Sequence, residues 1–187
     1  MAAVAEAVRR KELNAEIVLV ASDRRTAHAL ETAEGMGLRT LAFSVKEGPP
    51  GAWQGPLIEE MVRAGTDLVV LAGFLRVLGP PFFERFKGRI VNTHPSLLPK
   101  HSGPGMYGLR DHEAVLAAHE PTTGASVHVV TPEVDRGPVL ARAELPIEPG
   151  ETAQQLSDRQ KPVEHRILVE VLRRFAKGEL PLPYPTG

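Results

Sequence analysis

Short apolar runs rich in β-branched residues recur along the first half of the chain, and they constrain its fold more than any other feature. They occupy residues 16–22, 38–43, 67–73 and 89–93. The run at 67–73 is apolar at consecutive positions, which is typical of a strand covered on both faces. Patterns with helical periodicity separate the runs, at residues 26–36, 53–64 and 80–86. Strands that alternate with helices predict an α/β fold with a doubly wound, mostly parallel sheet flanked by helices.

The pattern changes in the second half of the chain. A loop rich in proline and glycine is predicted at residues 94–106, followed by a helix at 109–118. Two β-rich runs, 125–131 and 139–147, are joined by the turn-forming residues 132–137. This spacing predicts an antiparallel strand pair toward the C-terminus.

Two helical patterns lie near the ends of the chain, an amphipathic one over residues 1–14 and a long one over residues 152–175. Thr152 is a favourable N-cap for the long helix, and Gly178 lies where a helix commonly stops. The 187 residues suit a single domain, 1–187, and we find no internal repeat or linker. This doubly wound pattern usually begins with a strand, whereas the first element here is a helix.

Composition and motifs exclude several classes of function. The chain has no cysteine, which excludes disulfides, thiolate metal sites and a cysteine nucleophile, and suits a reducing cytoplasm. Lys and Arg number 22 against 23 Asp and Glu, so no basic excess favours nucleic acid or an anionic membrane. No run of about 18 apolar residues predicts a transmembrane helix. Dinucleotide, P-loop and Gly-x-Ser-x-Gly motifs are absent, which disfavours a dinucleotide enzyme, a nucleotide hydrolase and a serine hydrolase. The histidines lack metal-ligand spacing, so we expect no metal.

One pair of polar side chains lies where an α/β fold places its ligands, after a buried strand. Asn92 and His94 are two residues apart, so an extended chain directs both to the same side. An amide and an imidazole on one face can stabilise a developing oxyanion or move a proton. A simpler interpretation stays open, because a lone histidine at a strand end is often a satisfied polar group. Asp135 likewise has an ordinary interpretation as a turn residue.

The remaining histidines are assigned ordinary roles. We expect His128 to be a sheet residue and His101 to lie in a loop. The others fall on predicted helices, at positions expected to be on the surface: His28, His112, His119 and His165.

Four motifs together resemble the folate-dependent formyltransferases, in sequence, order and separation. They are residues 71–76 (LAGFLR), 92–99 (NTHPSLLP), 124–128 (GASVH) and 134–138 (VDRGP). The resemblance runs from residue 1 to about residue 180. It implies transfer of the formyl group of 10-formyltetrahydrofolate, as co-substrate, to the amine of glycinamide ribonucleotide in de novo purine biosynthesis.

Within that family, the chain length of 187 residues does not fit the members that carry a second domain. Members that formylate methionyl-tRNA carry an extra C-terminal domain, and those that hydrolyse formyltetrahydrofolate carry an extra N-terminal domain. Three further functions stay open: a different folate-dependent formyl transfer, deformylation, and folate binding by a protein inactive through loss of a phosphate loop. The resemblance implies a cytoplasmic enzyme that is a monomer or homodimer, with no metal, nucleic acid or membrane partner.

The resemblance also assigns roles to individual residues. The catalytic residues would be Asn92, His94 and Asp135. Asn92 and a protonated His94 would stabilise the oxyanion, and Asp135 would keep His94 protonated and order the water that carries a proton. Folate contacts would come from Leu75, Arg76, Val77, Leu78, Asn92, Thr131, Pro132, Glu133, Val134 and Asp135. Contacts to the ribonucleotide would come from Gly73, Pro95, Lys161 and Glu164.

Two departures from the family pattern fall on substrate-binding parts. The family's first strand and its Gly-x-Gly-Ser-Asn loop, which holds the substrate phosphate, have no counterpart in these residues. We therefore expect that the native protein has this strand and loop ahead of Met1. The family also often has an arginine just before the helical segment that contains Leu57 and Ile58, where this chain has residues 54–56 (QGP).

Overall fold

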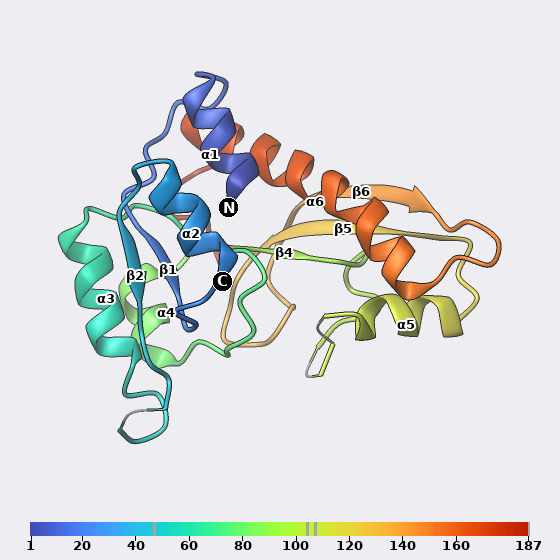
Figure 1. Ribbon diagram of the computed structural model, residues 1–187, viewed down its shortest axis with the longest axis horizontal. Coiled ribbons are helices and arrows are strands. Elements are labelled where there is room, and N and C mark those ends of the chain that lie inside the picture. The colour runs from blue at the N-terminus through green and yellow to red at the C-terminus, as the bar shows by residue number, and fades with distance from the viewer. Residues whose placement is uncertain (47, 104, 107, 187) are drawn as a thin grey trace.

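The strands of the structure form two sheets (Figure 1). In the smaller sheet, β1 (Val20–Ser22) pairs in parallel with β2 (Thr40–Ala42). The larger sheet has the order β3–β4–β5–β6. Its strands are β3 (Val69–Leu71), β4 (Ile90–His94), β5 (Thr122–Val129) and β6 (Val139–Pro146). Strands β3 and β4 run parallel, whereas β5 runs antiparallel to both of its neighbours.

These pairings confirm the α/β fold with parallel strands and a C-terminal antiparallel pair. Strands β1, β2 and β3 have three residues each and are shorter than the apolar runs that contain them, whereas β4 is as long as its run. For example, the run at 16–22 contributes only its last three residues to β1. The antiparallel character extends further than the sequence predicts, since β5 also pairs antiparallel with β4.

The two sheets are not joined by hydrogen bonds within the described part of the chain. The computed structural model describes residues 1–46, 48–103, 105–106 and 108–186. Pro104 of the predicted loop and Gly187 of the C-terminal tail lie outside the described residues. The inner edges of β1 and β3 therefore lack a partner strand among the described residues. The hypothesis of an additional strand ahead of Met1 stays a prediction.

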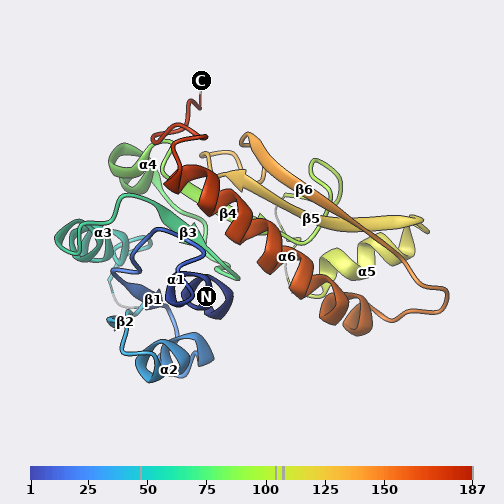
Figure 2. The same ribbon diagram turned by 90° about the horizontal axis from the view of Figure 1, so that it is seen from above.

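Helices cover both faces of the larger sheet. One face packs against α1 (Ala2–Arg9) and α6 (Ala153–Ala176), and Figure 2 shows α6 lying across β4 and β5. The other face packs against α3 (Gln54–Arg63) and α4 (Pro80–Phe86). Successive residues of a strand point to opposite faces, so Ile90 joins the second core and Val91 the first.

The two remaining helices lie at either end of the structure. Helix α2 (His28–Gly35) packs on β1 and β2, where Leu30 and Ala33 bury against Val20. Helix α5 (Arg110–Ala117) packs against α6 in the extended arm seen in Figure 1.

The ends of α6 agree with the sequence signals. The Thr152 side chain accepts the backbone N–H of Gln155, and the Gln155 side chain accepts the backbone N–H of Thr152. This reciprocal capping box satisfies N–H groups that an α-helix leaves free at its start. Gly178 follows the last turn with φ of 73°, a conformation that favours glycine. The predicted start and stop are therefore both confirmed.

Candidate active site

Strand β4 carries the two polar residues singled out in the sequence. Its register with β5 sets Asn92 opposite His128 and His94 opposite Ser126. The Asn92 Nδ2 atom lies 3.2 Å from His128 Nε2. The His94 side chain is buried, with only 4% of the residue exposed. Asn92 is paired on both sides, with Leu71 of β3 and His128 of β5, whereas His94 is paired with β5 alone.

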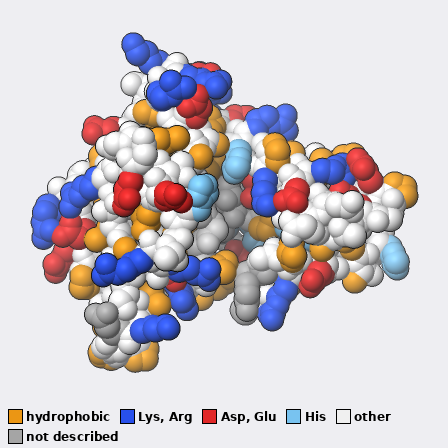
Figure 3. Space-filling view, viewed as in Figure 1, with side chains coloured by type: hydrophobic (Ala, Val, Ile, Leu, Met, Phe, Trp, Pro, Cys, Tyr) orange, Lys and Arg blue, Asp and Glu red, His pale blue; other side chains and the backbone are white. Residues whose placement is uncertain are grey.

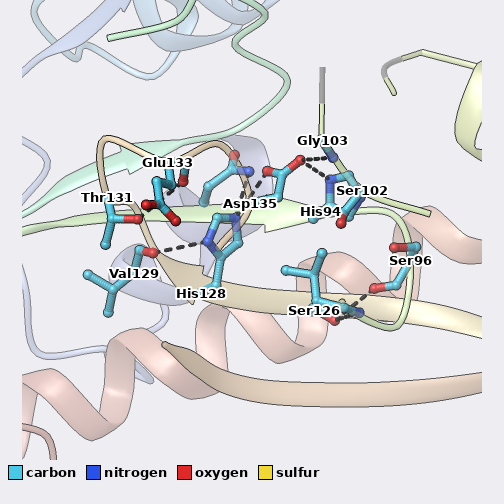
Figure 4. A network of polar contacts seen from close by, with 12 residues as sticks. His94, Ser96, Ser102, Gly103, Ser126, His128, Val129, Thr131, Glu133 and Asp135 are labelled. Atoms are coloured by element: carbon cyan, nitrogen blue, oxygen red, sulfur yellow. Dashed lines mark hydrogen bonds and ion pairs between the residues drawn. The ribbon is translucent and has the colours of Figure 1, made fainter. Parts of the chain in front are cut away.

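The imidazole of His94 has an oxygen near each of its nitrogens, and Figure 4 shows the contact with Asp135. Its Nε2 lies 2.9 Å from the carbonyl oxygen of His101, and a carbonyl can only accept, so this nitrogen donates. Its Nδ1 faces the Asp135 carboxylate, with 3.8 Å between Nδ1 and Oδ2. The ring therefore lies between a backbone carbonyl and a carboxylate.

Asp135 comes from the loop between β5 and β6 and lies in a strained conformation. Its φ of 55° is in the left-handed region that residues other than glycine rarely adopt. One carboxylate oxygen accepts the backbone N–H of Gly103 at 3.0 Å. The other lies 3.7 Å from His128 Nε2. Backbone strain of this kind persists where surrounding contacts impose it, and it is common at functional sites.

The same loop requires glycine at residue 137. A Cβ on Gly137 would overlap the carbonyl oxygen of Val129, so only glycine allows the loop to fold this closely against β5. The close approach fixes the chain two residues after Asp135. It therefore supports the placement of the carboxylate beside His94.

His128 belongs to the site, which the sequence analysis did not foresee. It is a strand residue, as expected, and its burial lowers its pKa, which favours the neutral ring. Its Nδ1 donates to the carbonyl of Val129, which leaves Nε2 to accept from the Asn92 amide. This contact fixes the orientation of the Asn92 amide. His128 is part of the motif at 124–128, but only the pairing register of β4 with β5 brings it into contact with Asn92.

Two buried serines shape the loop after β4. The Ser126 hydroxyl donates to the Ser96 carbonyl at 2.7 Å and accepts the Leu98 N–H at 3.0 Å. The Ser96 hydroxyl donates to the Lys100 carbonyl at 2.6 Å. These bonds turn the loop back so that the His101 carbonyl meets His94. Sequence reasoning assigned neither serine a role.

The first group of residues expected to contact folate follows β3. Leu75 and Val77 are 57% and 69% exposed, which leaves both side chains free to contact a ligand. Arg76 pairs with Asp23, with 2.9 Å between Nε and Oδ2. The Leu78 side chain instead packs in the core with Phe82, so only its backbone and one edge can reach a ligand.

The second group lies after β5. A groove of about 650 Å³ brings Leu78 next to Thr131 and Pro132, two segments far apart in the sequence. The Thr131 hydroxyl donates to the Glu133 carbonyl at 3.1 Å and so fixes this turn. Val134 is half-buried and precedes Asp135 directly. Residues 131–134 thus lie on the loop that carries Asp135, and Leu78 lines the same groove from the segment after β3.

The residues expected to contact the ribonucleotide are more dispersed. Gly73 is exposed with φ of 67°, and Pro95 is half-buried directly after His94. On α6, Glu164 accepts from the Gln160 amide at 3.3 Å, and burial raises its pKa. Lys161 lies on the exposed side of α6, where its Nζ pairs with Asp158 at 2.7 Å.

One surface assignment is wrong. His112 is only 3% exposed, because the side of α5 that carries it packs toward the interior. Burial lowers its pKa, and neither ring nitrogen has a hydrogen-bond partner among the described residues. His28, His119 and His165 are exposed, as the sequence analysis expects.

The surface around the site carries charges of both signs. Figure 3 shows basic and acidic side chains on each part of this face, with a hollow between the N-terminal part and the arm of α5. Within the described residues, no group of three or more His, Asp or Glu side chains is placed to hold a metal ion. No described helix is both long and apolar enough to cross a membrane.

Comparison with known proteins identifies the family. The formyl transferase family model matches residues 1–172. Phosphoribosylglycinamide formyltransferase of Escherichia coli (strain K12) is 36% identical over 183 residues, covering 95% of this chain and 82% of the relative. The trifunctional purine biosynthetic protein adenosine-3 of Bos taurus is 35% identical over 96% of this chain, which spans 17% of that protein.

A solved structure agrees with these relatives. Glycinamide ribonucleotide transformylase 1 from Symbiobacterium toebii superposes with a TM-score of 0.90 at 35% identity, covering 96% of this chain and 82% of that chain. The chain belongs to the formyl transferase family, and within it to the phosphoribosylglycinamide formyltransferases. The resemblance carried by its four motifs is therefore confirmed.

Proposed function

We propose that this enzyme transfers the formyl group of 10-formyltetrahydrofolate to the amine of glycinamide ribonucleotide. The observation that carries the proposal is the cluster of Asn92, His94 and Asp135, with the His94 ring placed between two acceptors. Family membership supplies the substrate class, and the cluster supplies the chemistry. We also propose, from the family resemblance, that the enzyme is cytoplasmic, is a monomer or homodimer and uses no metal.

The chemistry follows from the charges at the site. The amine nitrogen of the ribonucleotide forms a bond to the formyl carbon, and the carbonyl electron pair moves to oxygen. The second N–H of the Asn92 amide donates to this oxyanion, which is worth about 3 kcal/mol, and the positive charge of the protonated His94 ring stabilises it electrostatically. When the intermediate collapses, its bond to N10 of tetrahydrofolate breaks, and one proton moves from the amine to N10.

Asp135 has two tasks in this scheme. Its negative charge beside Nδ1 favours the protonated form of His94. It also orders the water that relays the proton from amine to N10. Exposed Leu75 and Val77, with the turn that carries Thr131, form the contacts for the pterin, while Glu164 faces the ribonucleotide.

The direct test is product analysis. The purified chain is incubated with 10-formyltetrahydrofolate and glycinamide ribonucleotide, and products are identified by mass spectrometry. We expect formylated ribonucleotide, no released formate, and the same rate in strong chelator. Released formate would indicate a deformylase, transfer to a different amine would indicate another acceptor, and a strict metal requirement would contradict the site.

A further inference from the structure

A second carboxylate lies beside His94, and the proposed chemistry has not used it. Asp111 is in the first turn of α5 and is completely buried. Its Oδ1 lies 3.7 Å from His94 Nε2, at the edge of the ring opposite Asp135. Neither of its oxygens has a hydrogen-bond partner among the described residues. Two carboxylates thus flank one imidazole, from two different parts of the chain.

A buried carboxylate without hydrogen bonds is costly, so its presence calls for a compensating charge. Burial raises the pKa of Asp111, and the neighbouring His94 is the strongest influence that opposes this rise. The backbone N–H of Asp111 itself opposes the rise as well. Burial thus favours the neutral form of Asp111, and among the charged groups around it a positive charge on His94 is the one that most favours the ionised form.

Other ionisable groups face this pair from the surrounding elements. Asp135 approaches from the β5–β6 loop and His101 from the loop after β4, while His128 lies on β5. Glu164 and Lys161 approach from α6. None of these is an anion placed at Nε2 within 4 Å in the described structure, whereas Asp111 is.

We propose that Asp111 is a positioning residue, whose carboxylate keeps His94 protonated from the Nε2 side while Asp135 does so from the Nδ1 side. The inference rests on the proposed function, because it concerns how His94 is prepared for the oxyanion. Asp111 acts through His94, since it is completely buried and the His94 ring lies within 4 Å of its carboxylate.

The test is the pH dependence of the rate in Asp111→Asn. Asparagine has the shape of protonated aspartic acid, so it removes only the charge. Protonated His94 is lost as pH rises, and an anion within 4 Å delays that loss by at least about one pH unit. In Asp111→Asn the alkaline fall in kcat should therefore move to lower pH. The rates of the two proteins should be equal at low pH and differ at least about tenfold above both midpoints.

The matched control is Glu113→Gln, which removes one exposed carboxylate two residues along the same helix. Its pH profile should equal that of the wild type. A rate ratio for Asp111→Asn that does not change with pH would overturn the proposal, because a purely structural defect lowers the rate equally at every pH. Asp111→Ala must show the same pH pattern, which covers the case in which asparagine prevents folding.

A second readout does not depend on turnover. NMR of histidine-labelled protein should show the His94 ring losing its proton at lower pH in Asp111→Asn than in the wild type, and at unchanged pH in Glu113→Gln. Identical His94 titrations in all three proteins would overturn the role of Asp111. A wild-type chain without formyl transfer would contradict the proposed function instead, and the NMR comparison would still decide on Asp111.

Discussion

The two sheets of the molecule differ in how deeply their strands are buried. In the larger sheet, β5 is buried at every residue but its first, between β4 and β6. In the smaller sheet, β2 has no buried residue and β1 has only Val20. The three proposed catalytic residues lie on the larger sheet, Asn92 and His94 on β4 and Asp135 in the loop after β5. Catalytic groups need fixed positions, and these residues lie on or directly beside well-buried strands.

The largest effect should follow from removing the ring at the centre of the larger sheet. His94→Ala should lower kcat by about 10²–10³-fold, because it removes the positive charge that we propose stabilises the oxyanion. The matched control is His28→Ala, an exposed histidine on the helix over the smaller sheet. It should retain the wild-type kcat. Equal losses in the two variants, measured as formyl transfer, would contradict the division of roles between the sheets.

The next effect concerns stability and compares one substitution in each sheet. Val127→Ala in β5 removes two fully buried methyl groups and should cost about 2–3 kcal/mol of unfolding free energy. Val20→Ala in β1 should cost about 1 kcal/mol, because its neighbours at the open edge can relax into the space. Urea unfolding measures both values. A larger cost for Val20→Ala would show that the smaller sheet is the better packed.

The smallest effect concerns helix caps on the two sides. Thr152→Ala removes the capping box of α6, which packs on the larger sheet, and should cost about 1 kcal/mol. Thr26→Ala, just before α2, should change stability much less, because α2 has no side-chain cap. Thermal unfolding distinguishes these outcomes. A loss for Thr26→Ala as large as that for Thr152→Ala would contradict the assigned helix start.

Local patterns predicted the elements well, because each depends on neighbouring residues. The two-residue spacing of Asn92 and His94 predicted their shared side, and Thr152 predicted the start of α6. The sequence left the role of Asp135 open between turn and site. In the structure Asp135 lies beside His94, because the β5–β6 loop packs closely against β5 at Gly137, where a Cβ would overlap the Val129 carbonyl.

Contacts between distant segments could not be predicted in the same way. His128 meets Asn92 through the register of β4 with β5, and no local pattern fixes that register. Asp111 reaches His94 only because the loop after β4 returns on itself, held by Ser96 and Ser126. His112 was misplaced for a related reason, since α5 packs against α6 on that side.

The measurement that tests the central claim most directly is the steady-state kinetics of Asp135→Asn. Asparagine tolerates a positive φ, so the strained turn and its bond from Gly103 can persist while the charge is lost. The account predicts a kcat lower by about 10²-fold or more, with KM for both substrates little changed. Asp67→Asn, at an exposed position before β3, is the control and should behave as the wild type. A wild-type kcat in Asp135→Asn would return Asp135 to the role of a turn residue and contradict the account.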